Sequence, residues 1–141
     1  IEPVFSAISS KTQWLGKVGN GSRMKLVVNA WLITMMQGVA EATRLAETLG
    51  FTTDEFWSAL EGGPLGTPYA KAKLDMIKSG RFEAQMALAW GLKDAGLALD
   101  VAKDHQMPAL ERIHEVWADA VEAGLGELDI AAVYRHLGES A

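Results

Sequence analysis

The fold is decided by Gly19-Asn20-Gly21-Ser22-Arg23-Met24-Lys25-Leu26-Val27-Val28-Asn29, a glycine turn that leads into a strongly apolar helix. The helix is expected to run from residue 22 to residue 49, because Gly50 is a suitable residue to end it. Apolar side chains lie on every side of the helix over residues 26–36. A helix of that kind is buried among other helices, so we predict that it forms the centre of a helical bundle.

Two polar side chains, Lys25 and Asn29, share one face near the start of this helix, with Cβ atoms expected about 6 Å apart. The helical neighbours of Lys25 include no acid, so the lysine cannot form an ion pair within the helix. Two interpretations stay open on spacing alone. Lys25 is either a helix-end lysine that reaches for water, or a functional ammonium at the rim of a cleft with Asn29 beside it to orient a ligand.

Composition narrows the function classes. The chain of 141 residues has 13 basic and 18 acidic residues, a net charge of −5, so it lacks the basic excess that nucleic-acid surfaces show. The absence of cysteine excludes disulfides and thiol chemistry and fits a reducing cytoplasm. No signal peptide opens the chain, and the apolar run over residues 26–36 is too short to span a bilayer. We therefore expect a cytoplasmic protein without nucleic-acid or membrane partners.

Helical signals continue to the end of the chain, and period-2 alternation is almost absent. Thr52 and Glu55 form a capping box, Pro108 opens a helix, and Asp129 caps the last one. The fold is therefore predicted as all-α, a multi-helix bundle built on two long apolar helices. After the first helix, the predicted helices are residues 53–61, 69–78, 84–105 (the second long helix), 108–123 and 130–137.

The first 18 residues do not fit the bundle. Residues 3–8 are expected to form a short helix and residues 12–15 an extended piece. An isolated strand is not stable, so we infer that its sheet lies upstream. The predicted domains are residues 1–18, the remnant of an upstream α/β domain, and residues 19–141, a helical C-terminal domain.

A second charged pair, Lys93-Asp94, lies within the predicted second long helix. Trp90 and Leu97 are helical neighbours of both residues, so the two charges lie among apolar side chains. In one interpretation, the two side chains point to solvent or pair with residues of other helices. In the other, they form a second charged wall of the Lys25 cleft.

The remaining residue patterns give little evidence of a function. The histidines at 105, 114 and 136 lack metal-ligand spacing, so no metal is expected. With Gly19 and Gly21 as the first glycines of a dinucleotide fingerprint, Met24 stands where the third should be. Gly38 favours close helix packing. Core or interface positions are expected for Trp31, Trp57, Trp90 and Trp117.

The spacing Gly-x-Gly-x-x-x-Lys-x-x-x-Asn resembles the catalytic-lysine segment of the β-hydroxyacid dehydrogenases, which include 3-hydroxyisobutyrate dehydrogenase and are related to 6-phosphogluconate dehydrogenase. The resemblance covers residues 3–137 and matches the C-terminal half of that family. Lys93-Asp94, after the turn at residues 80–82, resembles a Lys-Asp pair of the family. Met86 departs from the phenylalanine that many semialdehyde reductases have eight residues before the aspartate.

The resemblance implies a NAD- or NADP-dependent oxidoreductase of a β-hydroxy acid or its semialdehyde, with the cofactor held mainly by an upstream domain. It implies that Lys25 is the general acid/base, with burial favouring its neutral form, and that Asn29 binds the substrate. It implies that Lys93 and Asp94 lie beside the cofactor. It also implies a homodimer or higher homo-oligomer, and inactivity of these 141 residues alone. The alternatives are a non-catalytic helical dimerisation module and an imine-reducing relative, many of which lack the lysine.

Overall fold

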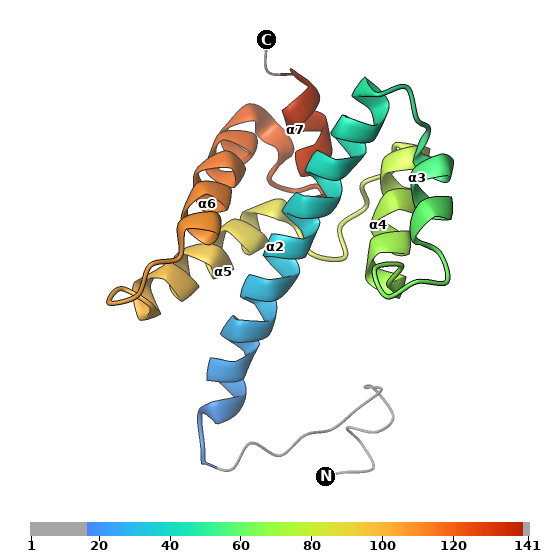
Figure 1. Ribbon diagram of the computed structural model, residues 1–141. Helices are drawn as coiled ribbons and strands as arrows, with labels where there is room; N and C mark the ends of the chain where they lie inside the picture. Colours follow the sequence, from blue (N-terminus) through green and yellow to red (C-terminus); the bar gives the residue numbers. More distant parts are fainter. Residues whose placement is uncertain (1–16, 140–141) are drawn as a thin grey trace.

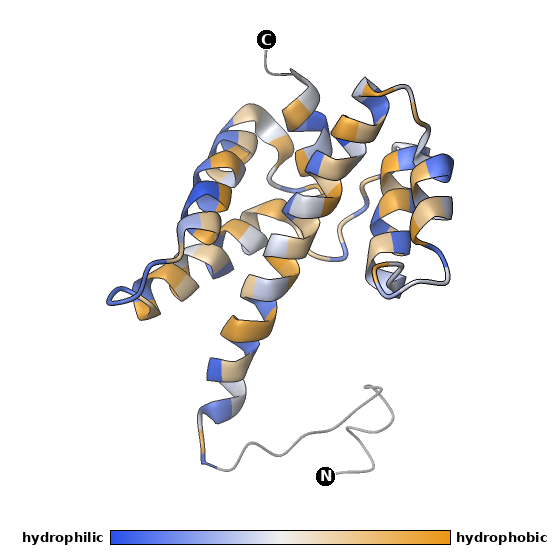
Figure 2. Cartoon of the chain, viewed as in Figure 1, coloured by the Kyte–Doolittle hydropathy of each residue, from blue (hydrophilic) through white to orange (hydrophobic). Residues whose placement is uncertain are grey.

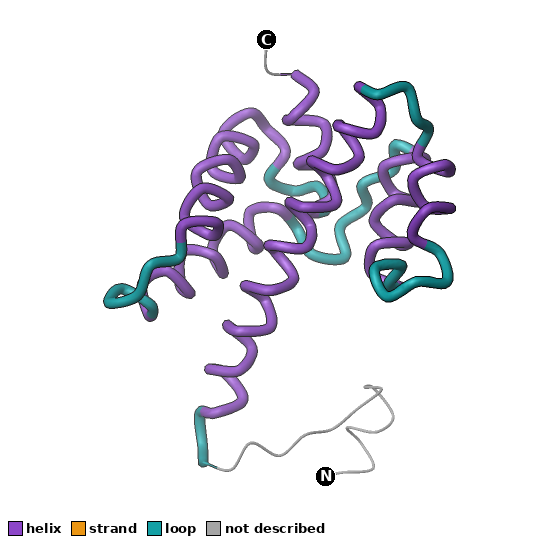
Figure 3. The backbone as a smooth tube through the Cα atoms, viewed as in Figure 1, coloured by secondary structure: helices purple, strands orange, loops and turns teal. Residues whose placement is uncertain are grey.

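Helices follow one another through residues 17–139, the part of the chain that the computed structural model describes (Figure 1). The elements are α2 (Asn20–Thr48), α3 (Thr53–Leu60), α4 (Pro68–Ser79), α5 (Leu88–Val101), α6 (Pro108–Ala120), the π-helical turn η1 (Val121–Leu125), the 3-10 turn η2 (Ile130–Ala132) and α7 (Val133–Glu139). Figure 3 shows helices and loops only for these residues, so the all-α prediction is confirmed. The segments predicted at 3–8 and 12–15 lie outside the described residues.

The long helix α2 begins and ends close to the predicted residues. Gly19 adopts φ 90°, a left-handed conformation that glycine takes at no steric cost, and the helix starts at the next residue. Its 29 residues give a length of about 43 Å. Beyond its C-terminal end Gly50 has φ 88°, as a helix-ending glycine should.

The core surrounds the C-terminal half of α2, which α5, α6 and α7 cover on one side and α3 and α4 on the other (Figure 1). Trp117 of α6 is fully buried at its centre, and its indole Nε1 donates to Oε1 of Gln37 in α2 at 2.8 Å. The core position predicted for Trp117 is therefore confirmed. Its most deeply buried neighbours are Ile33, Met36, Ala40, Leu88, Ala95, Ile130 and Val133.

The prediction of a second long helix is wrong. Residues 84–105 contain only the 14-residue α5, because the segment before it lies extended against residues 126–130. The Ile130 amide donates to the Met86 carbonyl at 2.9 Å, and the Asp129 amide donates to the Phe82 carbonyl at 3.0 Å. Ala87 and Asp129 form an isolated antiparallel bridge. The described chain therefore has one long helix, α2.

The burial predicted for α2 is also wrong over its first half. Its N-terminal turns extend beyond the other helices, and apolar residues lie along them (Figure 2). Val27 and Trp31 keep 61% and 63% of their surface exposed. The apolar pattern indicated a helix that needs partners on every side, and over the first half residues 17–139 supply them on one side only, where Asn29 meets Asp94 of α5. No helix in this part of the chain has the length and apolar character to cross a membrane.

Two predicted caps are confirmed. The Thr52 hydroxyl accepts from the Glu55 amide at 3.1 Å, and the Glu55 carboxylate accepts from the Thr52 amide at 2.8 Å. The Asp129 side chain accepts from the Ala131 amide at 2.9 Å and starts η2. The helix that begins at Pro108 ends at residue 120 rather than 123, because the chain enters the π-helical turn, in which Gly124 has φ 97°.

Candidate active site

The structure brings two of the predicted site residues together. Asn29 of α2 and Asp94 of α5 are 65 residues apart in sequence, and the Asn29 Nδ2 donates to the Asp94 Oδ2 at 2.7 Å. Both side chains are half-buried. The hydrogen bond fixes which way the Asn29 amide faces and leaves its oxygen and its second N–H available for another partner.

Lys25 lies one helical turn before Asn29, on the same face of α2. It is exposed, and no acid among residues 17–139 forms an ion pair with it. The burial expected for this lysine is therefore not provided by the described part of the chain. The exposed Lys25 side chain starts one helical turn before the Asn29–Asp94 contact, toward the N-terminal end of α2.

Lys93 takes a different position from Asp94. Its side chain is exposed, and its Nζ lies 5.1 Å from the centroid of the Trp90 ring, a cation–π contact. Met86, the residue that departs from the family pattern, is half-buried and packs against the core. Trp90 is 62% exposed, so it is not a core residue and keeps only the predicted interface role.

Sequence reasoning missed the residue that lets α5 approach the core. A Cβ atom on Gly91 would come within 2.5 Å of the Trp117 ring and 3.0 Å of Ile130. Only glycine therefore allows α5 to lie where Asp94 reaches Asn29. The signal available was a glycine inside an apolar helix, which often has a packing reason, but its partner is 26 residues further on.

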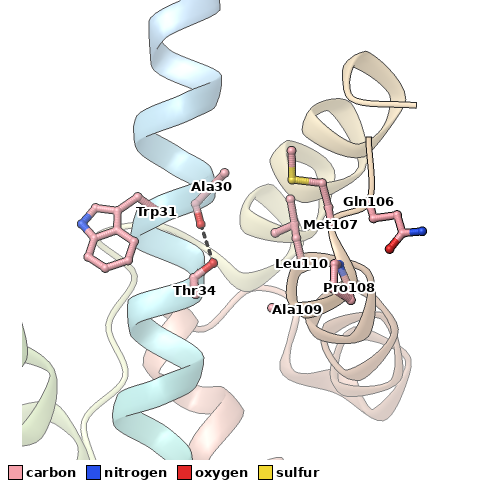
Figure 4. A pocket seen from close by; sticks show the side chains of 8 residues that line it. All are labelled: Ala30, Trp31, Thr34, Gln106, Met107, Pro108, Ala109 and Leu110. Carbon is pink, nitrogen blue, oxygen red and sulfur yellow. Dashed lines mark hydrogen bonds between the residues drawn. The ribbon is translucent and has the colours of Figure 1, made fainter. Parts of the chain in front are cut away.

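An apolar hollow of about 730 Å³ opens beside the α2–α5 crossing. Leu26 and Ala30 of α2 face Ala98 of α5 across it, and Arg23 is the charged residue of its lining. A second hollow of about 430 Å³ continues from Ala30 along residues 106–110 (Figure 4). In that view the Trp31 ring points away from Met107 and Leu110, and 63% of the Trp31 surface is exposed. No cluster of three metal-ligating side chains occurs in residues 17–139.

Comparison with known proteins identifies the family. Residues 19–137 match the family model described as the NAD-binding domain of NADP-dependent 3-hydroxyisobutyrate dehydrogenase. The chain belongs to this family. The cofactor of this family is accordingly NAD or NADP.

Relatives within the family carry different names. The chain is 32% identical to glyoxylate/succinic semialdehyde reductase 1 of Arabidopsis thaliana, over 93% of this chain and 46% of the relative. It is 33% identical to the cytokine-like nuclear factor N-PAC of Aedes aegypti, over 92% of this chain and 24% of the relative. A solved 3-hydroxyisobutyrate dehydrogenase of Mycobacterium tuberculosis, bound to L-serine, superposes with a TM-score of 0.78 at 25% identity, over 96% of this chain and 49% of that one. The chain thus spans half or less of the length of these relatives.

Proposed function

We propose that this chain is the catalytic-lysine domain of a NAD(P)-dependent oxidoreductase that acts on a β-hydroxy acid or its semialdehyde, of the 3-hydroxyisobutyrate type. The observation that carries the proposal is the hydrogen bond of 2.7 Å between Asn29 and Asp94, one helical turn from Lys25, in a member of this family. Residues 1–18 are then the end of an upstream dinucleotide-binding domain, and residues 19–141 are the helical domain.

Oxidation of a β-hydroxy acid removes a hydride and the hydroxyl proton, so the site needs an acid/base group. The nicotinamide supplies the hydride acceptor when it is bound. Lys25 takes the hydroxyl proton as general base, and returns it as general acid in the reverse direction. Asn29, oriented by Asp94, directs its free amide N–H and its carbonyl oxygen at the substrate.

The described residues fit only one end of the dinucleotide. Lys93 and the half-buried Asp94 offer polar contacts beside the crossing, which suits the nicotinamide end and its ribose. The lining of the large hollow is apolar apart from Arg23, so it does not suit a pyrophosphate. The upstream domain must therefore hold the phosphates and cover Lys25, which would exclude water from the ammonium. Hydride transfer is accordingly not expected from residues 1–141 alone.

A double-mutant cycle tests whether Asn29 and Asp94 act as one unit. In the complete protein, we expect Asn29→Ala and Asp94→Ala each to lower kcat/KM for short β-hydroxy acids by about 10- to 100-fold. The kcat/KM of the double variant should be about that of the poorer single variant, because each substitution breaks the same hydrogen bond. Glu83→Ala, an exposed acid before α5, serves as the control. Fully additive losses would mean that the contact has no part in turnover.

A non-catalytic dimerisation module is the second candidate, and the similarity to N-PAC favours keeping it. An imine-reducing relative is less consistent with Lys25, which many of those enzymes lack. Full loss of turnover in a Lys25→Ala variant would exclude the non-catalytic dimerisation module.

We propose, in either case, that the complete protein is at least a homodimer, joined through the outer face of α2. Apolar or small residues recur along this face in alternate steps of four and three, the spacing of a helix-pairing seam. They are Met24, Val28, Trp31, Met35, Gly38, Ala42, Leu45 and Leu49, here named the outer seam. Trp31 and Leu45 are 63% and 60% exposed, and an added Cβ on Gly38 would meet no atom within 4 Å among the described residues. A long apolar seam of this kind needs a partner.

Charge indicates that the partner is a second copy in antiparallel orientation. Residues 17–25 contain three basic residues and no acid, whereas residues 41–55 contain four acids and one base. Antiparallel pairing about Gly38 sets the basic end of each copy toward residues 51–59 of the other, which contain Asp54 and Glu55. It also sets Trp31 of one copy beside Leu45 of the second copy, with the glycine allowing close approach at the crossing.

The mass of the protein in solution tests the outer seam. We expect Trp31→Glu and Leu45→Glu each to convert the complete protein from dimer to monomer, or to halve the mass of a higher oligomer, in light scattering after size exclusion. Leu65→Glu is the matched control, because Leu65 is 73% exposed in a loop away from the seam. An unchanged mass in both seam variants would refute this interface.

A further inference from the structure

A fully buried ion pair lies outside the proposed site. The Lys73 Nζ of α4 is 2.8 Å from the Asp129 Oδ2, and the two side chains are 4% and 0% exposed. By contrast, Lys71 and Asp75 on the same helix pair at the surface. Buried ion pairs seldom stabilise more than well-packed apolar residues, because both charges lose their hydration. Stability alone therefore does not explain this pair.

The Asp129 carboxylate joins three separate segments. Its Oδ2 accepts from Lys73 and from the Ala131 amide at 2.9 Å. Its Oδ1 accepts from the Gln85 and Met86 amides at 3.0 and 3.2 Å. Burial would raise the pKa of this carboxyl, but the hydrogen bonds from Lys73 and the backbone outweigh it and keep the pKa below its ordinary value. Asp129 therefore stays ionised and holds all four donors at neutral pH.

These contacts fix where α5 begins. No side chain caps the start of α5. Its first amides are satisfied by the segment that contains Asp129: Leu88 donates to the Leu128 carbonyl at 2.8 Å, and Ala89 donates to the Gly126 carbonyl at 3.0 Å. The residues just before the helix are held by the Asp129 carboxylate itself. The start of α5 is thus attached to a segment that Lys73 anchors to α4.

Small movements at this attachment reach the site. Asp94 lies seven residues after Ala87, about 10 Å along the helix axis. The Asn29–Asp94 hydrogen bond of 2.7 Å leaves the usual range of hydrogen-bond lengths, and so weakens, when it grows by more than about 0.5 Å. A tilt of only about 3° at the start of α5 produces that displacement.

We infer that Lys73 and Asp129 are positioning residues, which fix the start of α5 and so hold Asp94 within hydrogen-bonding reach of Asn29. The pair touches neither substrate nor cofactor in this account. Its consequence for turnover rests on the proposed function, whereas its effect on the Asn29 side chain does not.

The test uses the side-chain amide signals of Asn29 in the complete protein, labelled with ¹⁵N-asparagine and assigned by comparison with Asn29→Ala. Asp94→Ala marks where these signals lie when the hydrogen bond is absent. We expect Lys73→Met, which keeps the length of the side chain and removes its charge, to move the signals toward that position. Lys71→Met, the surface lysine two residues away, should leave them unchanged. Asp129→Asn, which keeps the shape of the side chain, is the second variant should Lys73→Met not fold.

Turnover separates this inference from the proposed function. We expect kcat to fall about tenfold in Lys73→Met while KM for the nicotinamide cofactor is unchanged. A lower Tm with the Asn29 signals in their original place would overturn the inference, because the pair would then only stabilise the fold. If the signals move and kcat does not, the positioning role stands and the catalytic role proposed for Asn29 fails.

Discussion

The two halves of α2 differ in what surrounds them. From Ile33 onward, one face of the helix is buried against α5, α6 and α7, and a buried glutamine of this half bonds to Trp117. Before Ile33 the same helix carries Lys25 and Asn29 but leaves most of its apolar side chains exposed. One continuous helix therefore joins a region that is packed in the core to a region whose apolar side chains are mostly exposed. Substitutions in the two halves should accordingly change different properties.

The largest contrast is expected between two methionines of α2. Met36 is fully buried and Met24 is 42% exposed. Met36→Ala should lower the free energy of unfolding by about 2–5 kcal/mol, since it leaves a cavity in the core. Met24→Ala should change it by about 0.5 kcal/mol or less. Urea unfolding of both variants in a Leu45→Glu background, which we expect to be monomeric, measures the difference. Equal losses would mean that the N-terminal half is part of the same cooperative core.

Two glycines offer a smaller contrast. Gly91→Ala should cost about 1–3 kcal/mol, because its Cβ would overlap the Trp117 ring, and it should also lower turnover by moving Asp94. Gly38→Ala meets no atom within 4 Å in the described chain and should stabilise the monomer by up to about 1 kcal/mol through helix propensity. Thermal unfolding in the same monomeric background checks both. A Gly91→Ala protein of normal stability and turnover would show that α5 can shift without harm to the site.

Local signals predicted much of the fold. The ends of α2, the capping box at Thr52 and the cap at Asp129 each depend on residues within four positions, and each is confirmed. The second long helix failed because hydrogen bonds from a segment some forty residues later hold Phe82 and Met86 extended. Helical periodicity contains no information on such pairing.

The site was predicted less completely. The spacing of Lys25 and Asn29 placed them on one face, but nothing in the sequence paired Asn29 with Asp94. The burial expected for Lys25 is not provided by the described residues and stays a prediction for the complete protein, because an apolar pattern shows that a helix needs a cover and not which element supplies it. Gly91 and Lys73 act through partners distant in sequence, so their roles required the structure.

The central claim is that the exposed half of α2 carries the chemistry, through Lys25. Its most direct test is the rate of NAD(P)H formation by the complete protein with short β-hydroxy acids after Lys25→Ala, beside Lys103→Ala, an exposed lysine in the turn after α5. We predict that Lys25→Ala lowers kcat by about 10²- to 10⁴-fold, with cofactor affinity and Tm unchanged, and that Lys103→Ala has no effect. Near-normal turnover in Lys25→Ala would contradict the account and leave the helical domain a structural and dimerising role.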